Sequence, residues 1–110
     1  MILFNSAEFF KAHEVWEELW LSAGETDKLF LQGMIQLAAA FHHYTRGNLK
    51  GTKSLLEAGL DKLRKFPGEY RGANLNALRG AADGWLAALT SGGPATLAEF
   101  PQIEFVQPRQ

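Results

Sequence analysis

The chain contains no cysteine and only four prolines among its 110 residues. Without cysteine it has no disulfide, no thiolate metal ligand and no cysteine nucleophile, a composition compatible with a reducing compartment. Hydrophobic runs are short: no uninterrupted one is longer than Leu37–Phe41, which is far below the roughly 20 residues that span a bilayer. Residues Met1–Asn5 lack the basic segment of a signal peptide. These absences predict a cytoplasmic protein with no membrane partner.

A surplus of one charge sign is also missing, since 11 basic residues face 12 acidic ones and the net charge is −1. Bulk attraction to nucleic acid is therefore not predicted. The charges are nevertheless segregated: residues 1–27 carry six acids and one base, whereas residues 46–79 carry eight bases and three acids. We expect these regions to attract each other, either within the fold or between the copies of a homo-oligomer.

Apolar side chains recur at helical spacing through four segments, and no strand pattern recurs. The first helix is predicted to begin near Ser6, with Asn5 as N-cap and Glu8 completing a capping box. Gly24 ends the run near Ala23. One face of this helix is predicted to enter the core. Its members are Phe9, Ala12, Val15, Trp16, Leu19 and Trp20.

The second helix is predicted from Lys28 to about Thr45, with Thr26 or Asp27 as its cap. Its apolar side chains occur nearly all round the helix. A helix of that kind is normally enclosed by other helices, so we expect this one at the centre of the fold.

Two asparagines are placed to begin the remaining helices. Asn48 precedes a third helix that ends at Phe66–Gly68, and Asn74 precedes a C-terminal helix of about residues 74–91. Residues 94–110 are expected to add one turn and then an extended strap. The pattern predicts an all-α fold. The predicted architecture is a single-domain bundle over the whole chain, with four main helices plus a short C-terminal turn and an extended tail.

Two pairs of polar residues mark the first helix. His13 and Glu17 are one turn apart and border Trp20, so we expect them at the edge of the core, buried and in need of partners. Glu14 and Glu18 form a second pair about 100° round the helix, nearer to solvent.

The second helix carries a polar seam that can supply those partners. Gln32, Gln36 and His43 fall within about 40° of one another on its helical wheel. An unpaired buried polar group costs about 1–3 kcal/mol, so two polar seams on adjacent helices stabilise the fold most by meeting. We therefore predict that His13 and Glu17 face Gln32 and Gln36.

Two functions are compatible with such a meeting. In the first, the seam is a buried His/Glu/Gln hydrogen-bond network inside a non-catalytic binding or scaffolding module, a homodimer with an unspecified ligand. In the second, the protein is a metal-assisted hydrolase or related enzyme. His13, Glu17 and His43 would then hold a divalent metal, and His13, Glu17 and Glu18 would be the catalytic candidates. The metal signal is weak, because Glu17 stands where His-Glu-x-x-His has its second histidine.

These residues also carry a family resemblance, which covers about residues 4–63. The sequence Phe-Phe-Lys-Ala-His-Glu-Val-Trp-Glu-Glu-Leu-Trp at 9–20, the segment 30–41 and Arg-Gly-Asn at 46–48 together resemble the family named domain of unknown function 309. The resemblance implies a small all-helical bundle with a His-x-x-x-Glu-Glu-x-Trp hallmark and no assigned activity. The residues that it marks as binding or catalytic candidates are His13, Glu17, Glu18, Trp20, Gln32, Gln36 and Asn48.

Overall fold

The computed structural model describes residues 2–5 and 8–90, and the described part is almost entirely helical. The predicted all-α fold is confirmed. The predicted C-terminal turn and strap, residues 94–110, lie outside the described residues. The elements are α1 (Ile2–Asn5), α2 (Phe9–Ser22), α3 (Glu25–Thr45), α4 (Leu49–Leu63), β1 (Glu69–Tyr70), β2 (Ala73–Asn74) and α5 (Leu75–Thr90).

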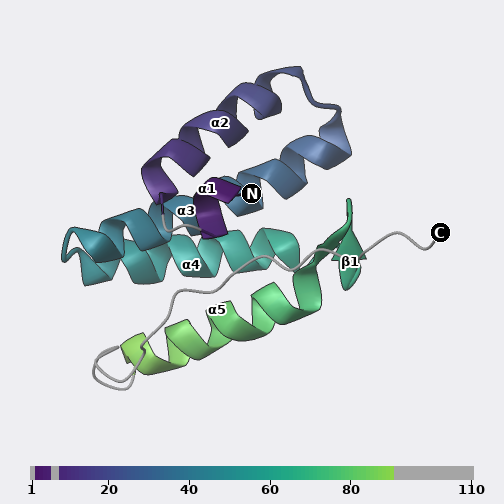
Figure 1. Cartoon of the computed structure of the whole chain (residues 1–110). Coiled ribbons are helices and arrows are strands. Elements are labelled where there is room, and N and C mark those ends of the chain that lie inside the picture. The colour runs from purple at the N-terminus through teal and green to yellow at the C-terminus, as the bar shows by residue number, and fades with distance from the viewer. Residues whose placement is uncertain (1, 6–7, 91–110) are drawn as a thin grey trace.

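The α3–α4 hairpin forms the middle of the molecule. Helix α2 packs on α3 from one side, and α5 packs on α4 from the other (Figure 1). The prediction that the second helix is enclosed is confirmed, because α3 has buried residues from Phe30 to Phe41. Its buried residues are Phe30, Gly33, Met34, Ile35, Leu37, Ala38, Ala40 and Phe41.

Helices α3 and α4 approach closely at a pair of glycines. A Cβ atom on Gly59 would lie 2.9 Å from the backbone oxygen of Gly33, and one on Gly33 would lie 3.0 Å from Leu63 Cδ2. Real Cβ atoms do not make contacts shorter than 3.0 Å with backbone, so this crossing depends on the absence of a side chain at Gly59, whereas a Cβ at Gly33 would require Leu63 to shift.

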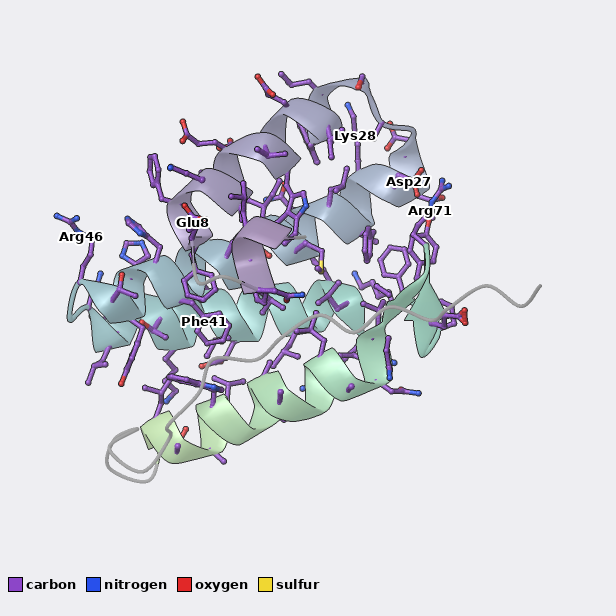
Figure 2. The ribbon with its side chains drawn as sticks, viewed as in Figure 1. Glu8, Asp27, Lys28, Phe41, Arg46 and Arg71 are labelled. Carbon is purple, nitrogen blue, oxygen red and sulfur yellow. The ribbon has the colours of Figure 1, made fainter. Side chains whose placement is uncertain are left out.

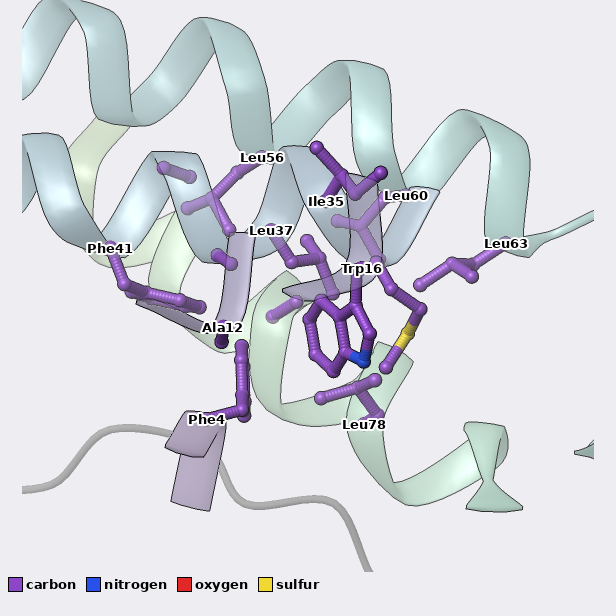
Figure 3. Close-up of a cluster of buried hydrophobic side chains, with 14 of the residues drawn as sticks. Phe4, Ala12, Trp16, Ile35, Leu37, Phe41, Leu56, Leu60, Leu63 and Leu78 are labelled. Carbon is purple, nitrogen blue, oxygen red and sulfur yellow. The ribbon is translucent and has the colours of Figure 1, made fainter. Parts of the chain in front are cut away.

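Aromatic side chains join the helices into one core. Phe4 of α1 packs edge-on against Phe9, with ring centroids 5.2 Å apart. The ring centroids of Phe41 of α3 and Trp85 of α5 lie 5.2 Å apart. Figure 3 shows Trp16 of α2 reaching into the same cluster as the leucines of α4 and α5.

The start of α2 differs from its prediction. Asn5 is the last residue of α1, and Glu8, at the N-cap of α2, makes no side-chain capping bond. The backbone N–H of Glu8 instead donates to the carbonyl of Leu3, at 2.8 Å. The predicted Asn5 cap is wrong because the short helix α1 folds back over the core and supplies a backbone acceptor there.

Helix α3 begins at Glu25, three residues before its predicted start, and Gly24 is its N-cap. Thr26 and Asp27 lie inside the first turn and do not cap the helix. An acidic residue in the first turn is still favourable, because the N-terminal end of a helix carries positive partial charge. Asp27 is also held there by contacts from a distant part of the chain.

Those contacts come from a small hairpin that the sequence did not predict. Its strands β1 and β2 pair Glu69 with Asn74 and Tyr70 with Ala73. Arg71 and Gly72, at φ 54° and 80°, form the turn with the left-handed geometry that two-residue hairpins favour. Strands of two residues are too short for an alternating pattern to be recognised.

The hairpin is fixed to the start of α3 through Asp27. The hydroxyl of Tyr70 donates to Asp27 Oδ1 at 2.7 Å, and Arg71 makes an ion pair with the same carboxylate (Figure 2). The hydrogen bond from Tyr70, and then that from Arg71, lowers the pKa of Asp27. The same contact raises the pKa of Tyr70, because the charged carboxylate disfavours a second anion.

The two predicted asparagine caps are confirmed. Asn48 Oδ1 accepts a hydrogen bond from the backbone N–H of Gly51 at 3.0 Å, and Asn74 Oδ1 accepts one from Ala77 at 3.0 Å. A short side chain three residues before an orphan N–H needs no tertiary partner to make this bond.

Only part of the predicted core face of α2 is buried. Phe9, Ala12 and Trp16 are buried and Trp20 packs partly against the core, whereas Val15 and Leu19 are 44% and 52% exposed. The prediction for Val15 and Leu19 is wrong because α2 is an outer helix. It packs on α3 and α1 and offers them only a narrow strip.

Candidate functional site

The predicted polar residues of α2 and α3 line a common pocket, which we name the α2–α3 pocket. Its volume is about 340 Å³, and Leu55 of α4 completes one wall. The structure thus brings together five of the predicted site residues. The complete lining is His13, Glu17, Trp20, Gln32, Ile35, Gln36, Ala39 and Leu55.

His13 and Glu17 contact each other at the rim of this pocket. His13 Nε2 lies 3.2 Å from Glu17 Oε1, and the side chains are 29% and 57% exposed. The prediction that this pair is buried is therefore wrong for Glu17, because α2 lies on the outside of the bundle. With Nε2 donating to the carboxylate, Nδ1 is left buried, and it has no hydrogen-bond partner among the described residues.

Gln36 has a partner that the sequence did not identify. Its Oε1 accepts a hydrogen bond from Lys62 Nζ at 2.9 Å, so the end of α4 holds the amide of α3. Within the described residues, neither His13 nor Glu17 makes a hydrogen bond to Gln36. The predicted meeting of the two seams therefore takes the form of a shared pocket, and the directly bonded network is wrong.

Trp20 forms the aromatic wall of the pocket. Its ring lies beneath the Lys28 ammonium, with Nζ 4.5 Å from the ring centroid. This cation–π contact fixes one side of the indole. Glu18, by contrast, lies in a neighbouring surface depression with Lys11 and Glu14 and does not line the α2–α3 pocket.

His43 and Asn48 lie elsewhere. His43 lines a second pocket of about 270 Å³, together with Phe10, His13, Ala39 and His42. The prediction that His43 completes the seam of Gln32 and Gln36 is therefore wrong. His43 is seven residues after Gln36, which places it about 10 Å further along the axis of α3.

Asn48 orients His43. Because Asn48 Oδ1 accepts from Gly51, its Nδ2 is the group that faces His43 Nδ1, at 3.2 Å. An amide nitrogen only donates, so the imidazole accepts at Nδ1 and carries its proton at Nε2. Its neighbour His42 has a lowered pKa, first because of burial and second because of the positive charge of Arg46.

The proposed metal ligands do not assemble. Among the described residues no three histidine or acidic side chains are grouped so as to hold a metal ion. His13 and Glu17 touch, but His43 occupies the other pocket. Two donors with no third fall short of a catalytic zinc site, which uses three protein ligands, so this donor set does not fit the metal.

None of the described helices has the length and apolar character to cross a membrane.

In comparisons with known proteins, the chain is 31% identical over 94 residues to an uncharacterized protein of Aquifex aeolicus (strain VF5). The match covers 84% of this chain but only 28% of that relative, so the chain spans less than a third of the relative's length. Residues 1–55 match the family described as Domain of unknown function (DUF309), and the chain therefore belongs to this family.

Proposed function

We propose that this domain is a non-catalytic binding module and that it takes a small polar ligand in the α2–α3 pocket. The observation that carries the proposal is the convergence of His13, Glu17, Gln32 and Gln36 on one pocket that also has the Trp20 wall. An apolar cavity with a few convergent polar groups is the usual form of a ligand site.

Some polar atoms at this pocket are not needed for the contacts that hold the fold together. The Glu17 carboxylate has a second oxygen besides the one that contacts His13, and Gln36 has an amide nitrogen besides the oxygen that Lys62 occupies. The volume of about 340 Å³ lies at the lower end of the range for small-molecule sites. A ligand of one ring or a few polar atoms is the appropriate size.

The alternative, a metal-assisted hydrolase, receives no comparable support. It requires His13, Glu17 and His43 at one centre, but Glu17 and His43 line different pockets, and of the three only His13 lines both. Among the described residues no third metal donor is grouped with the polar pair at the rim, and this pair is better suited to orienting a ligand than to breaking a bond.

The predicted homodimer and cytoplasmic location are part of the proposal. The exposed apolar side chains of α2 do not form one face: Phe10 and Leu21 lie about 20° apart on the wheel, on the opposite flank from Val15 and Leu19. We expect a homodimer in which one of these two flanks of α2 packs against the second copy of the chain. Light scattering after gel filtration would show it, and a monomer at all concentrations would contradict it.

A small-ligand screen tests the binding proposal. Free amino acids, nucleobases, monosaccharides and dicarboxylates would each be added at about 1 mM, where a ligand with a Kd of that order is half bound. The readouts are the Trp20 indole N–H and the Gln32 and Gln36 side-chain amide signals in a ¹⁵N spectrum of the whole chain. We expect at least one class to shift all three in a saturable manner.

A pocket-filling variant supplies the control. Ala39→Leu places three further carbon atoms in the pocket lining and should abolish the shifts. Ala87→Leu adds the same atoms on the exposed side of α5 and should leave them unchanged. The proposal is overturned if no class shifts these signals, or if the Ala39→Leu variant responds like the parent.

A further inference from the structure

We infer that the ligand of the α2–α3 pocket is a neutral, planar nitrogen heterocycle with an amide edge, a ring carbonyl beside a ring N–H. Pyrimidine bases and lactams belong to this chemical class. The inference rests on the proposed function and adds the ligand's identity by class. It follows from the orientation of three groups around the pocket.

The first group is the Gln36 amide, whose orientation is determined by Lys62. An ammonium group can only donate, so the atom 2.9 Å from Lys62 Nζ must be the amide oxygen. The amide nitrogen, with its two N–H groups, is then directed away from Lys62. Because Gln36 lines the pocket, these N–H groups are the donors available for a ligand carbonyl.

The second group is the carboxylate of Glu17. One of its oxygens contacts His13 Nε2 at 3.2 Å, and the side chain is 57% exposed, so the other oxygen remains an open acceptor. A ligand that places an N–H at this oxygen and a carbonyl at Gln36 must carry both a donor and an acceptor. An amide edge has that pattern, and the carboxamide of Gln32 can donate and accept beside it.

The third group is the indole of Trp20, with Ile35, Ala39 and Leu55 lining the remainder. Flat rings gain from stacking on an aromatic face, and nucleobases do so at many protein sites. The charges around the pocket also favour a neutral ligand. Glu17 at the rim disfavours an anionic ligand, and Lys28 over Trp20, with Lys62 on Gln36, disfavours a cationic one.

Uracil and its N,N′-dimethyl derivative test the inference, because the two share the planar ring and both carbonyls, and methyl groups replace both N–H donors in the derivative. We expect uracil to shift the Trp20 indole and Gln36 amide signals of the whole chain, and the dimethyl derivative to bind at least tenfold more weakly. Equal binding would overturn the amide edge and leave only stacking.

The decisive variant is Gln36→Glu. It keeps the shape of the side chain and gives Lys62 a carboxylate partner, but it removes the amide N–H donors. We expect its melting temperature to equal or exceed that of the parent, and its affinity for uracil to fall at least tenfold. Asn76→Asp adds the same charge on α5, where the carboxylate can still accept from Arg79, and should bind as the parent does.

The outcomes separate this inference from the proposed function. If uracil gives no shifts while an amino acid, a sugar or a dicarboxylate moves the same signals, the pocket binds ligands and the heterocycle class is wrong. If Gln36→Glu binds uracil as tightly as the parent does, the proposed orientation of the amide is wrong. If no compound moves these signals, both the inference and the proposed function fail.

Discussion

The α3–α4 hairpin and helix α2 use apolar residues in opposite ways. In the hairpin, Leu56 and Leu60 are almost completely buried and two glycines meet at the crossing. In α2 only a strip faces the core, while Leu19 is half exposed and Leu21 is 72% exposed. The hairpin is the part that stabilises the fold, and α2, which carries the His-x-x-x-Glu-Glu-x-Trp segment, presents side chains to the pocket and to solvent.

The sharpest test of this difference is a pair of leucine truncations. Leu56→Ala in α4 should lower the free energy of unfolding by about 2–5 kcal/mol, because it leaves a cavity in a fully packed core. Leu19→Ala in α2 should change it by about 0.5 kcal/mol or less, because that side chain is already half exposed. Urea denaturation of both variants measures the two values. A similar loss at both positions would mean that α2 is covered in solution.

A pair of glycine substitutions tests the crossing of α3 and α4. Gly59→Ala should destabilise the protein by up to about 2 kcal/mol, since the overpacking cost of ~1–3 kcal/mol outweighs the gain of about 1 kcal/mol in helix propensity. Its Cβ would meet the backbone oxygen of Gly33, which cannot turn aside.

Gly80 is the matched control for Gly59. Nothing lies within 4 Å of the Cβ that alanine would place there. Gly80→Ala in α5 should therefore raise the free energy of unfolding by about 0.5–1 kcal/mol, from helix propensity alone. Thermal melts of the two variants should shift in opposite directions. A stabilising Gly59→Ala would show that the hairpin is less tightly packed than described.

A smaller effect is expected at the rim of the α2–α3 pocket. His13 keeps a buried Nδ1 with no partner among the described residues, a burden of about 1–3 kcal/mol that an apolar residue does not have. His13→Leu should thus leave the stability unchanged or raise it by about 1 kcal/mol, and it should weaken ligand binding. Glu17→Ala should change stability by about 0.5 kcal/mol or less, because the pair is exposed.

Denaturant titrations of these two α2 variants provide the measurement. A loss of more than about 1 kcal/mol for His13→Leu would assign the imidazole to the fold, because an unpaired group held for a ligand contributes no such stability. The motif would then resemble the hairpin in its role, and the comparison between the two regions would fail at this position.

The smallest effect concerns the link between the β-hairpin and α3. The pKa of Asp27 is lowered in the folded protein from its ordinary 3.8 by Tyr70 and Arg71. A lowered carboxyl pKa stabilises the fold fully above the unfolded-state value, and this contribution is lost as the pH falls through the folded-state pKa.

Asp27→Asn should therefore be less stable than the parent at neutral pH, and the difference should shrink as the solution is acidified below about pH 4. Thermal melts over a pH series measure it. A difference that stays constant across the series would show that Asp27 acts only through hydrogen bonds that do not depend on its charge.

The local features of the fold could be predicted from the sequence. Asn48 and Asn74 were identified as caps because each bonds to an N–H three residues away, which local geometry alone places within reach. The predicted Asn5 cap was wrong because its N–H partner found a carbonyl in a separate helix. The short hairpin around Arg71 was missed, since two-residue strands carry no periodic pattern.

The candidate site shows the same limit. The wheel placed His13 and Glu17 on one side of α2, and Gln32 and Gln36 on one side of α3, and these four side chains do line one pocket. It could not show that Lys62, 26 residues further along the chain, would bond to Gln36. Long flexible side chains such as lysine have no preferred partner until the helices are packed.

What the sequence by itself determined is the all-helical class, the central position of the helix predicted at 28–45 and the polar residues of two helices that line one pocket. The spacing of apolar and polar side chains is a local property that any helix preserves. Only the tertiary structure decided that Glu17 is exposed, that His43 belongs to a second pocket and that Lys62 orients Gln36. The exposure of a side chain and its partners depend on which neighbouring helix covers it and on its position along the helix axis. A helical wheel shows neither the neighbouring helix nor the position along the axis.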